Sequence, residues 1–425
     1  MKVLRKDVVS NAFWMMSEKL IAIFGLIFVT SYVAKYIGPA NFGKISFAAA
    51  IFVIIQSISL FGSDSIIFKR ISRNKESGVI LMTSTKKTRA IFFCVLSIPV
   101  MFYLYLTSDF LTVLFGAVTC LASYFTTLDV YSIYNNATLS SKINTVCNTV
   151  GLMVGLLVRF LVAKFDIGVE YLAIPIILTS AIPYWMKRVN FRVTWSHIEK
   201  SVIQKRKRKK YINYLVGAGL PLAISGVSIT LYTRLSQLFL MKFGGDVELG
   251  IFSAASSLAT AWTFVTLSVI TSYYAKIYNC TDRKIALKMA SKLNGLIAVV
   301  ALLAVIGIYL FGKFVIFHLY GNAYEAAYNI MLILSVATFF AAMGPVAYRY
   351  IVYESGYKYL SYKMFITFLV NLPLAFFLTK KYGMYGAAYS TLLTELLSLT
   401  ILNYFFKRGV ILKMHILSTM PKTYM

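Results

Sequence analysis

The chain has 425 residues, a mean hydropathy of +0.73 and 14% charged residues, compared with about 25% in an ordinary soluble protein. This composition excludes a typical soluble enzyme and indicates a membrane protein. The 43 Lys and Arg residues exceed the 15 Asp and Glu residues, giving a net charge of +28, which in a soluble chain would indicate a nucleic-acid partner. No nucleic acid is expected here, because most of the basic residues fall between apolar segments.

Apolar segments of about 20 residues, the length needed to cross ~30 Å of hydrocarbon, recur along the whole chain. Glu18 and Lys19 interrupt the first of them, and no small-residue cleavage site follows, so we interpret it as a membrane helix and not as a signal peptide. Twelve spans are predicted, in chain order at residues 11–34, 45–68, 90–107, 110–131, 143–163, 168–186, 212–241, 250–275, 293–312, 326–352, 364–379 and 384–406.

The basic residues lie mostly on one side of these spans. With the N-terminus in the cytoplasm, the inner segments hold 32 of the 43 Lys and Arg residues and the outer loops hold 7. Because short cytoplasmic loops are enriched in Lys and Arg, both termini are predicted to be cytoplasmic. The run QKRKRKKY, residues 204–211, falls in the longest inner loop, where its charges would contact the anionic headgroups of membrane lipids.

This basic loop separates six predicted spans from six others. The predicted organisation is a six-helix bundle over residues 1–186, a basic cytoplasmic linker over 187–211 and a second six-helix bundle over 212–425. A shift of 207 residues aligns 35–50 with 242–257, where five of 16 residues are identical and the pattern G-x-x-x-x-G is shared. The two halves are therefore predicted to be a repeat in the same orientation.

Catalytic and metal-binding motifs are missing from the sequence. The cysteines show no C-x-x-C spacing, and the three histidines are scattered. We expect no metal site and no cofactor, apart from H⁺ or Na⁺ as a coupling ion.

Four basic residues within spans are candidate substrate-binding residues, because an ionisable residue in a membrane segment is costly and usually functional. Arg234 and Lys19 lie deepest, and an arginine can bind a phosphate through two parallel hydrogen bonds. The alternative for both is a polar contact between helices. Arg159 and Arg349 lie near helix ends, where snorkelling toward headgroups would also explain them.

Four acidic residues are candidates for ion coupling: Glu18, Asp64, Asp129 and Glu395. For Asp64, a helix cap or an interfacial contact is an equal alternative. Pro221 in GAGLPLAISG is the candidate hinge, since proline and the neighbouring glycines weaken a helix. Close packing of small residues is the alternative explanation of this segment.

Several short motifs follow one another along the whole chain. They are Asn11 with Trp14 at the start of the first span, YIGPANFG in the first outer turn, FGSDSIIFKRIS at 61–72, GAGLPL at 217–222, TRLSQLFLMKFGGDVELGIFSAA at 233–255, LYGNAYEAA at 319–327 and NLPLAFFLTKKYGMYGAAYSTLLTE at 371–395. In this order, they resemble the polysaccharide repeat-unit flippases, the Wzx family of the multidrug/oligosaccharidyl-lipid/polysaccharide exporter superfamily. In one respect the sequence departs from the family. Relatives often place an acid directly before the arginine of the seventh span, whereas Thr233 precedes Arg234 here.

The resemblance implies an all-α integral membrane protein, with two six-helix bundles in the V shape of the MATE transporters. It further implies that the protein flips an undecaprenyl-diphosphate-linked oligosaccharide from the inner to the outer leaflet of the bacterial cytoplasmic membrane by alternating access. The product would be a surface polysaccharide such as O-antigen. A polysaccharide polymerase with its chain-length machinery would be the protein partner.

Three other functions remain open on the sequence. A multidrug or cation antiporter of the same fold would need an acidic and aromatic cavity, so the in-span Lys and Arg residues disfavour it. A membrane-embedded glycan polymerase or acyltransferase would need a large outer loop or a reactive histidine within the spans, and neither is predicted. A non-transporting scaffold would affect polymer export only indirectly.

Overall fold

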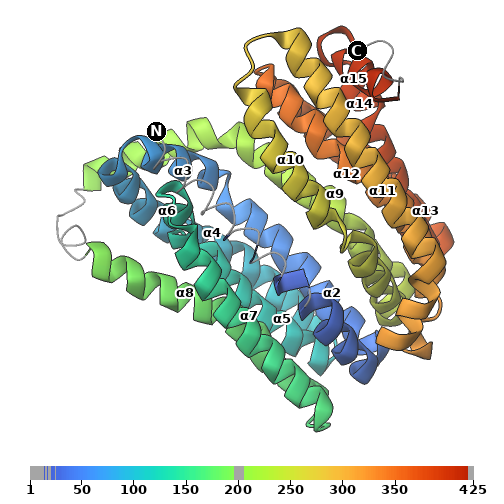
Figure 1. The fold of residues 1–425 in the computed structure, drawn as a ribbon. Coiled ribbons are helices and arrows are strands. Elements are labelled where there is room, and N and C mark those ends of the chain that lie inside the picture. The colour runs from blue at the N-terminus through green and yellow to red at the C-terminus, as the bar shows by residue number, and fades with distance from the viewer. Residues whose placement is uncertain (1–13, 15–16, 18–20, 24, 196–204, 420–425) are drawn as a thin grey trace. The chain divides into compact units, whose positions relative to one another are not determined.

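The protein is helical throughout the part of the chain that the structure, a computed structural model, describes. The described residues are 14, 17, 21–23, 25–195 and 205–419, and none of them forms a β-strand. Long helices lie side by side within each half of the chain (Figure 1). The fold class predicted from the apolar segments and from the family resemblance, all-α and membrane-spanning, is confirmed.

The helices have the following bounds. They are η1 Leu26–Thr30, α2 Ser31–Leu60, α3 Ser63–Arg73, α4 Lys75–Thr107, α5 Phe110–Leu128, α6 Tyr131–Ala137, α7 Ser141–Lys164, η2 Val169–Leu172, α8 Ala173–Trp195, α9 Lys205–Thr260, α10 Thr263–Tyr278, α11 Arg283–Leu319, η3 Asn322–Tyr324, α12 Ala327–Tyr353, α13 Tyr357–Leu399, α14 Ile401–Tyr404, η4 Phe406–Arg408 and α15 Val410–Thr419.

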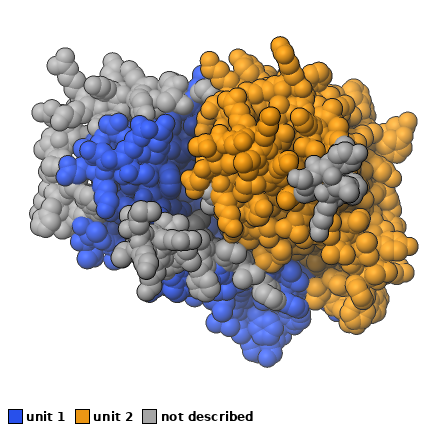
Figure 2. All heavy atoms as spheres, turned by 45° about the horizontal axis from the view of Figure 1, so that its top comes forward, with its two compact units in different colours: residues 1–230 blue, residues 231–425 orange. Residues whose placement is uncertain are grey.

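Two compact units make up the chain, residues 1–230 (unit 1) and 231–425 (unit 2) (Figure 2). The division falls inside α9, between Thr230 and Leu231, and the basic stretch that sequence reasoning took as the linker precedes it. The predicted linker and bundle limits therefore stay a prediction, as does the V-shaped arrangement of the two bundles.

Nine helical segments among the described residues are long and apolar enough to cross a membrane. Three of them are too long for one crossing, since at 1.5 Å per residue their lengths of 40, 57 and 48 residues give about 60, 85 and 70 Å. Each of the three contains one glycine with non-helical backbone angles, namely Gly38, Gly245 and Gly383. A multi-pass membrane protein is thus established, whereas the count of twelve spans stays a prediction.

Gly38 and Gly245 have almost the same backbone conformation. Their φ and ψ angles are 75° and 169° in Gly38, and 76° and −172° in Gly245. The 207-residue shift that aligns 35–50 with 242–257 pairs these two glycines. The repeat seen in the sequence therefore marks the same local break in both units, at positions where the positive φ favours glycine.

Within unit 2, the breaks at Gly245 and Gly383 are connected by one carboxylate. Glu248 Oε2 accepts a hydrogen bond from the backbone N–H of Met384 at 3.1 Å. Met384 is the first residue after Gly383, so the carboxylate meets free N–H groups where the helix restarts, a favourable position for negative charge. The contact fixes the two breaks against each other.

Most helices extend beyond the apolar segment that predicted them. The third span was predicted over 90–107, but α4 begins at Lys75, where the side chain of Asn74 caps the helix by accepting from Ser77 N at 2.9 Å. A polar N-cap and charged residues with good helix propensity continue the helix past the hydrocarbon, which hydropathy alone does not detect.

The C-terminal helix α15 packs on α11 and buries a histidine. His415 Nδ1 lies 3.1 Å from the hydroxyl of Tyr404, and within the described part of the chain its Nε2 is buried without a partner. Burial lowers the pKa of His415 from 6.5 to about 4. The imidazole is therefore neutral in the folded protein at neutral pH.

Replacing Gly245 with alanine is expected to destabilise the protein by about 1–3 kcal/mol, because its angles belong to a region that is essentially restricted to glycine. The added methyl would meet no other atom within 4 Å, so the effect would report the backbone alone. Gly226→Ala is the matched control, since Gly226 also has open space but lies within α9 at no positive φ. It should stabilise by about 0.5–1 kcal/mol. Unfolding in a denaturing detergent measures both, and equal effects would contradict the prediction.

Stability should fall on acidification because of His415. Its pKa is lower in the folded than in the unfolded protein, so its contribution is complete above pH 6.5 and is lost as the pH falls toward 4. At pH 5 the expected loss is about 1–2 kcal/mol. His415→Phe should remove this part of the pH dependence of the unfolding free energy, whereas His318→Gln, at an exposed position, should leave it unchanged. An unaltered pH profile in His415→Phe would disprove the assignment.

Candidate functional site

The ionisable side chains inside the membrane segments form the candidate site, since charge there needs a partner or a function. In unit 1 the backbone turns sharply between α2 and α3, where Phe61 and Gly62 both adopt left-handed angles. This turn places Ser63 and Asp64 at the start of α3. Nη2 of Arg89 on α4 reaches both, at 2.6 Å from Ser63 Oγ and 2.5 Å from Asp64 Oδ1.

Arg89 is thus a buried cation with an acidic partner. Its side chain is 2% exposed, whereas that of Asp64 is 50% exposed. Its second terminal nitrogen, Nη1, lies 3.5 Å from the backbone oxygen of Thr127. Asp64 was predicted as an ion-coupling acid. In the structure it forms an ion pair with Arg89, and half of its side chain is exposed.

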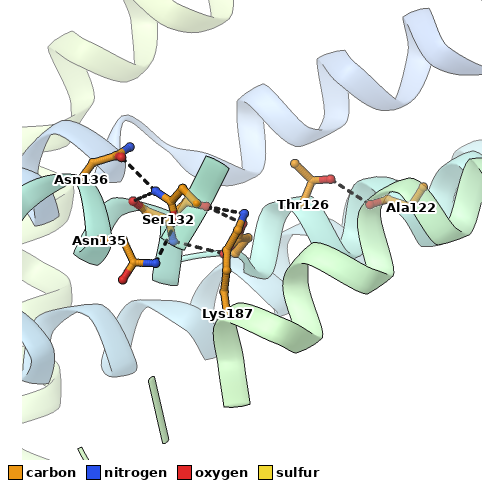
Figure 3. A network of polar contacts seen from close by, with 8 residues as sticks. Ala122, Thr126, Ser132, Asn135, Asn136 and Lys187 are labelled. Atoms are coloured by element: carbon orange, nitrogen blue, oxygen red, sulfur yellow. Dashed lines mark hydrogen bonds and ion pairs between the residues drawn. The ribbon is translucent and has the colours of Figure 1, made fainter. Parts of the chain in front are cut away.

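A second ion pair of unit 1 connects α8 with the break between α5 and α6. Lys187 Nζ lies 2.7 Å from Asp129 Oδ2 and 2.8 Å from Ser132 Oγ, and it is 2% exposed (Figure 3). Ser132 also donates to Asp129 Oδ2 at 2.6 Å. Asp129, another predicted ion-coupling acid, is therefore held by a cation and a hydroxyl.

Three asparagines extend this network toward α7. Asn144 donates to the backbone oxygen of Ser132 and to Asn136 Oδ1, both at 2.9 Å, and accepts from Asn135 at 2.8 Å (Figure 3). Buried amides that satisfy one another in this way make a rigid polar cluster. The cluster fixes the short helix α6 against α7 and α8.

Arg159, on α7, is different from the two paired cations of unit 1. It is partly buried, and none of the described residues offers its guanidinium a hydrogen bond or an ion pair. A guanidinium with five donors and no acceptor is available to an anion.

The predicted cations of unit 2 also lack acidic partners. Arg234 Nη1 makes a hydrogen bond of 3.2 Å to Gln237 Oε1, and Arg349 Nη2 one of 2.9 Å to Thr271 Oγ1. The guanidinium of Arg349 also lies 5.8 Å from the ring centre of Tyr274. No described carboxylate lies within 4.0 Å of either arginine.

Glu395, the predicted ion-coupling acid of unit 2, lies on α13 in a polar surrounding. Its neighbour Thr394 accepts a hydrogen bond of 2.9 Å from Asn371 Nδ2, and Ser390 lies 3.0 Å from Ser236 on α9. Of the predicted acids that the structure describes, Glu395 alone has no cation within ion-pair distance.

Three predicted site residues, Lys19, Glu18 and Pro221, have no side-chain contact that the structure describes. Lys19 and Glu18 lie outside the described residues. Pro221 lies within α9, which has no break at that position, and its hinge role stays a prediction. Within the described ranges, no three His, Cys, Asp or Glu side chains come together to hold a metal ion.

Three buried cations escaped the sequence reasoning: Arg89, Lys187 and Lys363. Each was assigned to an inner loop because it directly adjoins a predicted span, before 90–107, after 168–186 and before 364–379, respectively. In the structure each lies within a helix and is at most 5% exposed. The available signal was their position within one or two turns of a span, since membrane helices extend past the hydrocarbon.

The family described as "Polysaccharide biosynthesis protein" matches residues 8–277. No curated protein matches the sequence. Among solved structures, the chain resembles the lipid II flippase MurJ in an inward closed conformation, with a TM-score of 0.73, 15% identity, and coverage of 96% of this chain and 90% of that one. It also resembles a multidrug resistance MATE family transporter in an inward-facing conformation, with a TM-score of 0.58, 13% identity, and coverage of 96% and 95%.

A MOP superfamily transporter from Pyrococcus furiosus is similar too, with a TM-score of 0.57 and 13% identity over 98% of this chain and 97% of that one. At these identities the likeness establishes the fold that the flippase and the MATE transporters share.

The Asp129–Lys187 pair should couple strongly. Asp129→Asn would leave a buried ammonium unpaired and should cost about 3–5 kcal/mol of unfolding free energy. The double variant Asp129→Asn/Lys187→Met should cost clearly less than the sum of the two single variants. Lys313→Met is the control, because Lys313 and Glu325 are 74% and 76% exposed and should contribute at most about 1 kcal/mol. Additive effects at Asp129 and Lys187 would contradict the pairing.

Proposed function

This chain belongs to the polysaccharide biosynthesis protein family, and from that premise we propose that it is a flippase of lipid-linked oligosaccharides. The substrate would be an oligosaccharide on undecaprenyl diphosphate, moved from the inner to the outer leaflet of the bacterial cytoplasmic membrane by alternating access. The product would serve a surface polysaccharide such as O-antigen.

The observation that carries this proposal is a set of arginines in the membrane segments without acidic partners. Arg159, Arg234 and Arg349 have no described carboxylate within ion-pair distance. A diphosphate group needs such partners, because an unpaired phosphate charge costs many kcal/mol in hydrocarbon. Arginine offers a planar pair of donors that matches phosphate oxygens.

Two other buried cations, in contrast to these arginines, do have acidic partners. Arg89 and Lys187 are neutralised by Asp64 and Asp129, so they serve the structure of unit 1. What remains uncompensated in the spans of unit 2 is mainly positive charge. This sign favours an anionic substrate over the organic cations of a multidrug antiporter, although the MATE transporters share the fold.

The topology of twelve spans with both termini inside belongs to this proposal. The glycine breaks at Gly38, Gly245 and Gly383 support it, because each divides a segment too long for one crossing. Splitting the nine apolar segments at these breaks gives the expected twelve.

Flipping in reconstituted vesicles tests the function. The probe is a fluorescent short prenyl-diphosphate sugar, and a membrane-impermeant reductant reports how much of it has crossed. Wild type should equilibrate the probe between leaflets. The double variant Arg234→Gln/Arg349→Gln should do so at least about tenfold more slowly, as expected for the loss of two charge-assisted contacts.

Arg283→Gln is the matched control, because Arg283 begins α11, is 77% exposed and lies outside the apolar part of the helix. It should flip the probe like wild type. Vesicles in which wild-type protein moves an organic cation but leaves the diphosphate probe in place would overturn the proposal in favour of an antiporter.

A further inference from the structure

A stripe of lysines marks the beginning of α11. Lys284, Lys288 and Lys292 recur at four-residue spacing, which places them along one side of the helix, and all three are exposed. Residues 283–292 contain no acid. Positive charge near an N-terminus opposes the helix dipole, and like charges four residues apart repel each other. The lysines therefore do not stabilise the helix by themselves, whereas an anion beside them would relieve both effects.

Other sides of this part of α11 are covered by protein. Ala286 and Ala290 are buried in the core of unit 2. Ser291 and Asn294 face α15, where Ser418 Oγ donates to the backbone oxygen of Ser291 at 3.0 Å and lies 3.2 Å from Asn294 Nδ2. The lysines are exposed because neither the core nor α15 covers their side of the helix.

The same side of α11 continues into the membrane segment as an apolar surface. Leu296 and Leu303 follow Lys292 after about one and three turns and are 49% and 63% exposed. Residues 293–312 carry no charged side chain, and at 1.5 Å per residue they cover ~30 Å, the thickness of the hydrocarbon. Lys292 therefore lies at the edge of the hydrocarbon. The two other lysines lie about 6 and 12 Å beyond it, at the depth of the lipid headgroups and just outside them.

A phospholipid beside α11 therefore meets an apolar and a cationic surface at once. When its acyl chains lie along Leu296 and Leu303, its phosphate lies at the level of the lysines. A zwitterionic headgroup has a positive group of its own, whereas an anionic headgroup has a net negative charge that nearby lysines favour. The tendency of basic residues to gather at one membrane face accounts for their number, but it does not require them to line the lipid-exposed side of one helix.

Helix α4 of unit 1 uses its basic residues at the hydrocarbon edge differently. Its apolar segment, residues 90–107, follows directly on Arg89, which is paired with Asp64 at 2.5 Å. Lys86 Nζ donates to the hydroxyl of Tyr131 at 2.9 Å and lies 4.9 Å from the centre of that ring. These two cations contact protein groups of unit 1, whereas the lysine stripe of α11 is exposed on the side of the helix that continues into the lipid.

We propose that Lys284, Lys288 and Lys292 form a binding site for the headgroup of an anionic phospholipid. The site would lie in the leaflet that surrounds the first turns of α11, which is the inner leaflet in the predicted topology. It is separate from the basic run at 204–211, which precedes the apolar part of α9. The inference concerns the lipid around the protein and does not rest on the proposed flippase function, so either can fail without the other.

Quenching of tryptophan fluorescence by brominated lipids measures which lipid lies beside the stripe. Leu296→Trp places an indole about one turn from Lys292 on the same side of α11, and the signal of the four natural tryptophans is subtracted with the parent protein. The full-length protein is reconstituted in vesicles of phosphatidylglycerol and phosphatidylcholine in equal amounts, with one or the other lipid brominated. Phosphatidylglycerol should bind next to the indole with an affinity at least about fivefold above that of phosphatidylcholine.

Removing the lysines should remove this preference. In the Leu296→Trp protein, the ratio of the two affinities should fall below about twofold on adding Lys284→Gln, Lys288→Gln and Lys292→Gln. About 1 M salt shortens the electrostatic screening length to about 3 Å, so it should lower the ratio to the same level with the stripe intact. The salt measurement decides the question even if the lysine variant does not fold.

The matched control removes the same number of exposed lysines elsewhere in unit 2, by Lys313→Gln, Lys380→Gln and Lys381→Gln. These lysines lie beyond the opposite ends of their apolar segments. The control should keep the full preference for phosphatidylglycerol beside the indole.

A second indole tests whether the preference belongs to the stripe or to the net charge of +28. Phe92→Trp is the matched position on α4, because Phe92 is 49% exposed, as Leu296 is, and lies three residues after Arg89. The exposed Lys87 lies five residues before Phe92 and therefore about 140° around the helix. Phe92→Trp should show at most about a twofold preference.

Equal quenching by the two lipids in Leu296→Trp would overturn the inference and would leave the lysines to another anion, such as an acidic protein. A preference that survives the three glutamine substitutions or high salt would overturn it as well. So would an equal preference in Phe92→Trp, because the net charge of the protein, and not the stripe, would then attract the lipid.

Discussion

The structure depends on one physical constraint: charge inside a membrane segment must be compensated. In unit 1, Arg89 and Lys187 meet this constraint with carboxylates, and both pairs sit at places where a helix is interrupted. The break between α2 and α3 brings Asp64 within reach of α4, and the break between α5 and α6 brings Asp129 within reach of α8. Burying the charges therefore also fixes the interrupted helices.

In unit 2 the compensation is incomplete. Arg234 and Arg349 have neutral hydrogen-bond partners, and Lys363 has none among the described residues. A protein would gain stability by replacing such residues with apolar ones, so their presence points to a ligand that completes the site. An anionic lipid-linked sugar, the substrate class that we propose, has the required charge, and the chain belongs to the polysaccharide biosynthesis protein family.

Much of the fold could be predicted from the hydropathy of the segments and from the repeated positions of glycine. The fourth and tenth predicted spans, 110–131 and 326–352, agree closely with α5 and α12, because sharp polar turns bound them. The predicted repeat located Gly38 and Gly245 at equivalent breaks. Helix ends were missed where capping residues such as Asn74 carry the helix past the apolar segment.

The candidate site was less predictable, because pairing depends on contacts between distant segments. Nothing in the sequence separates Asp129, whose partner lies 58 positions away, from Glu395, which has no ion pair. Lys363 was missed because it lies at the edge of an apolar segment.

The decisive measurement compares two probes that differ in the diphosphate group, namely an anionic prenyl-diphosphate sugar and the neutral prenyl glycoside that lacks it. We predict that wild type binds the diphosphate at least about 100-fold more tightly, and that Arg234→Gln/Arg349→Gln loses most of this preference. Equal affinity of wild type for both probes would contradict a cationic substrate site in unit 2.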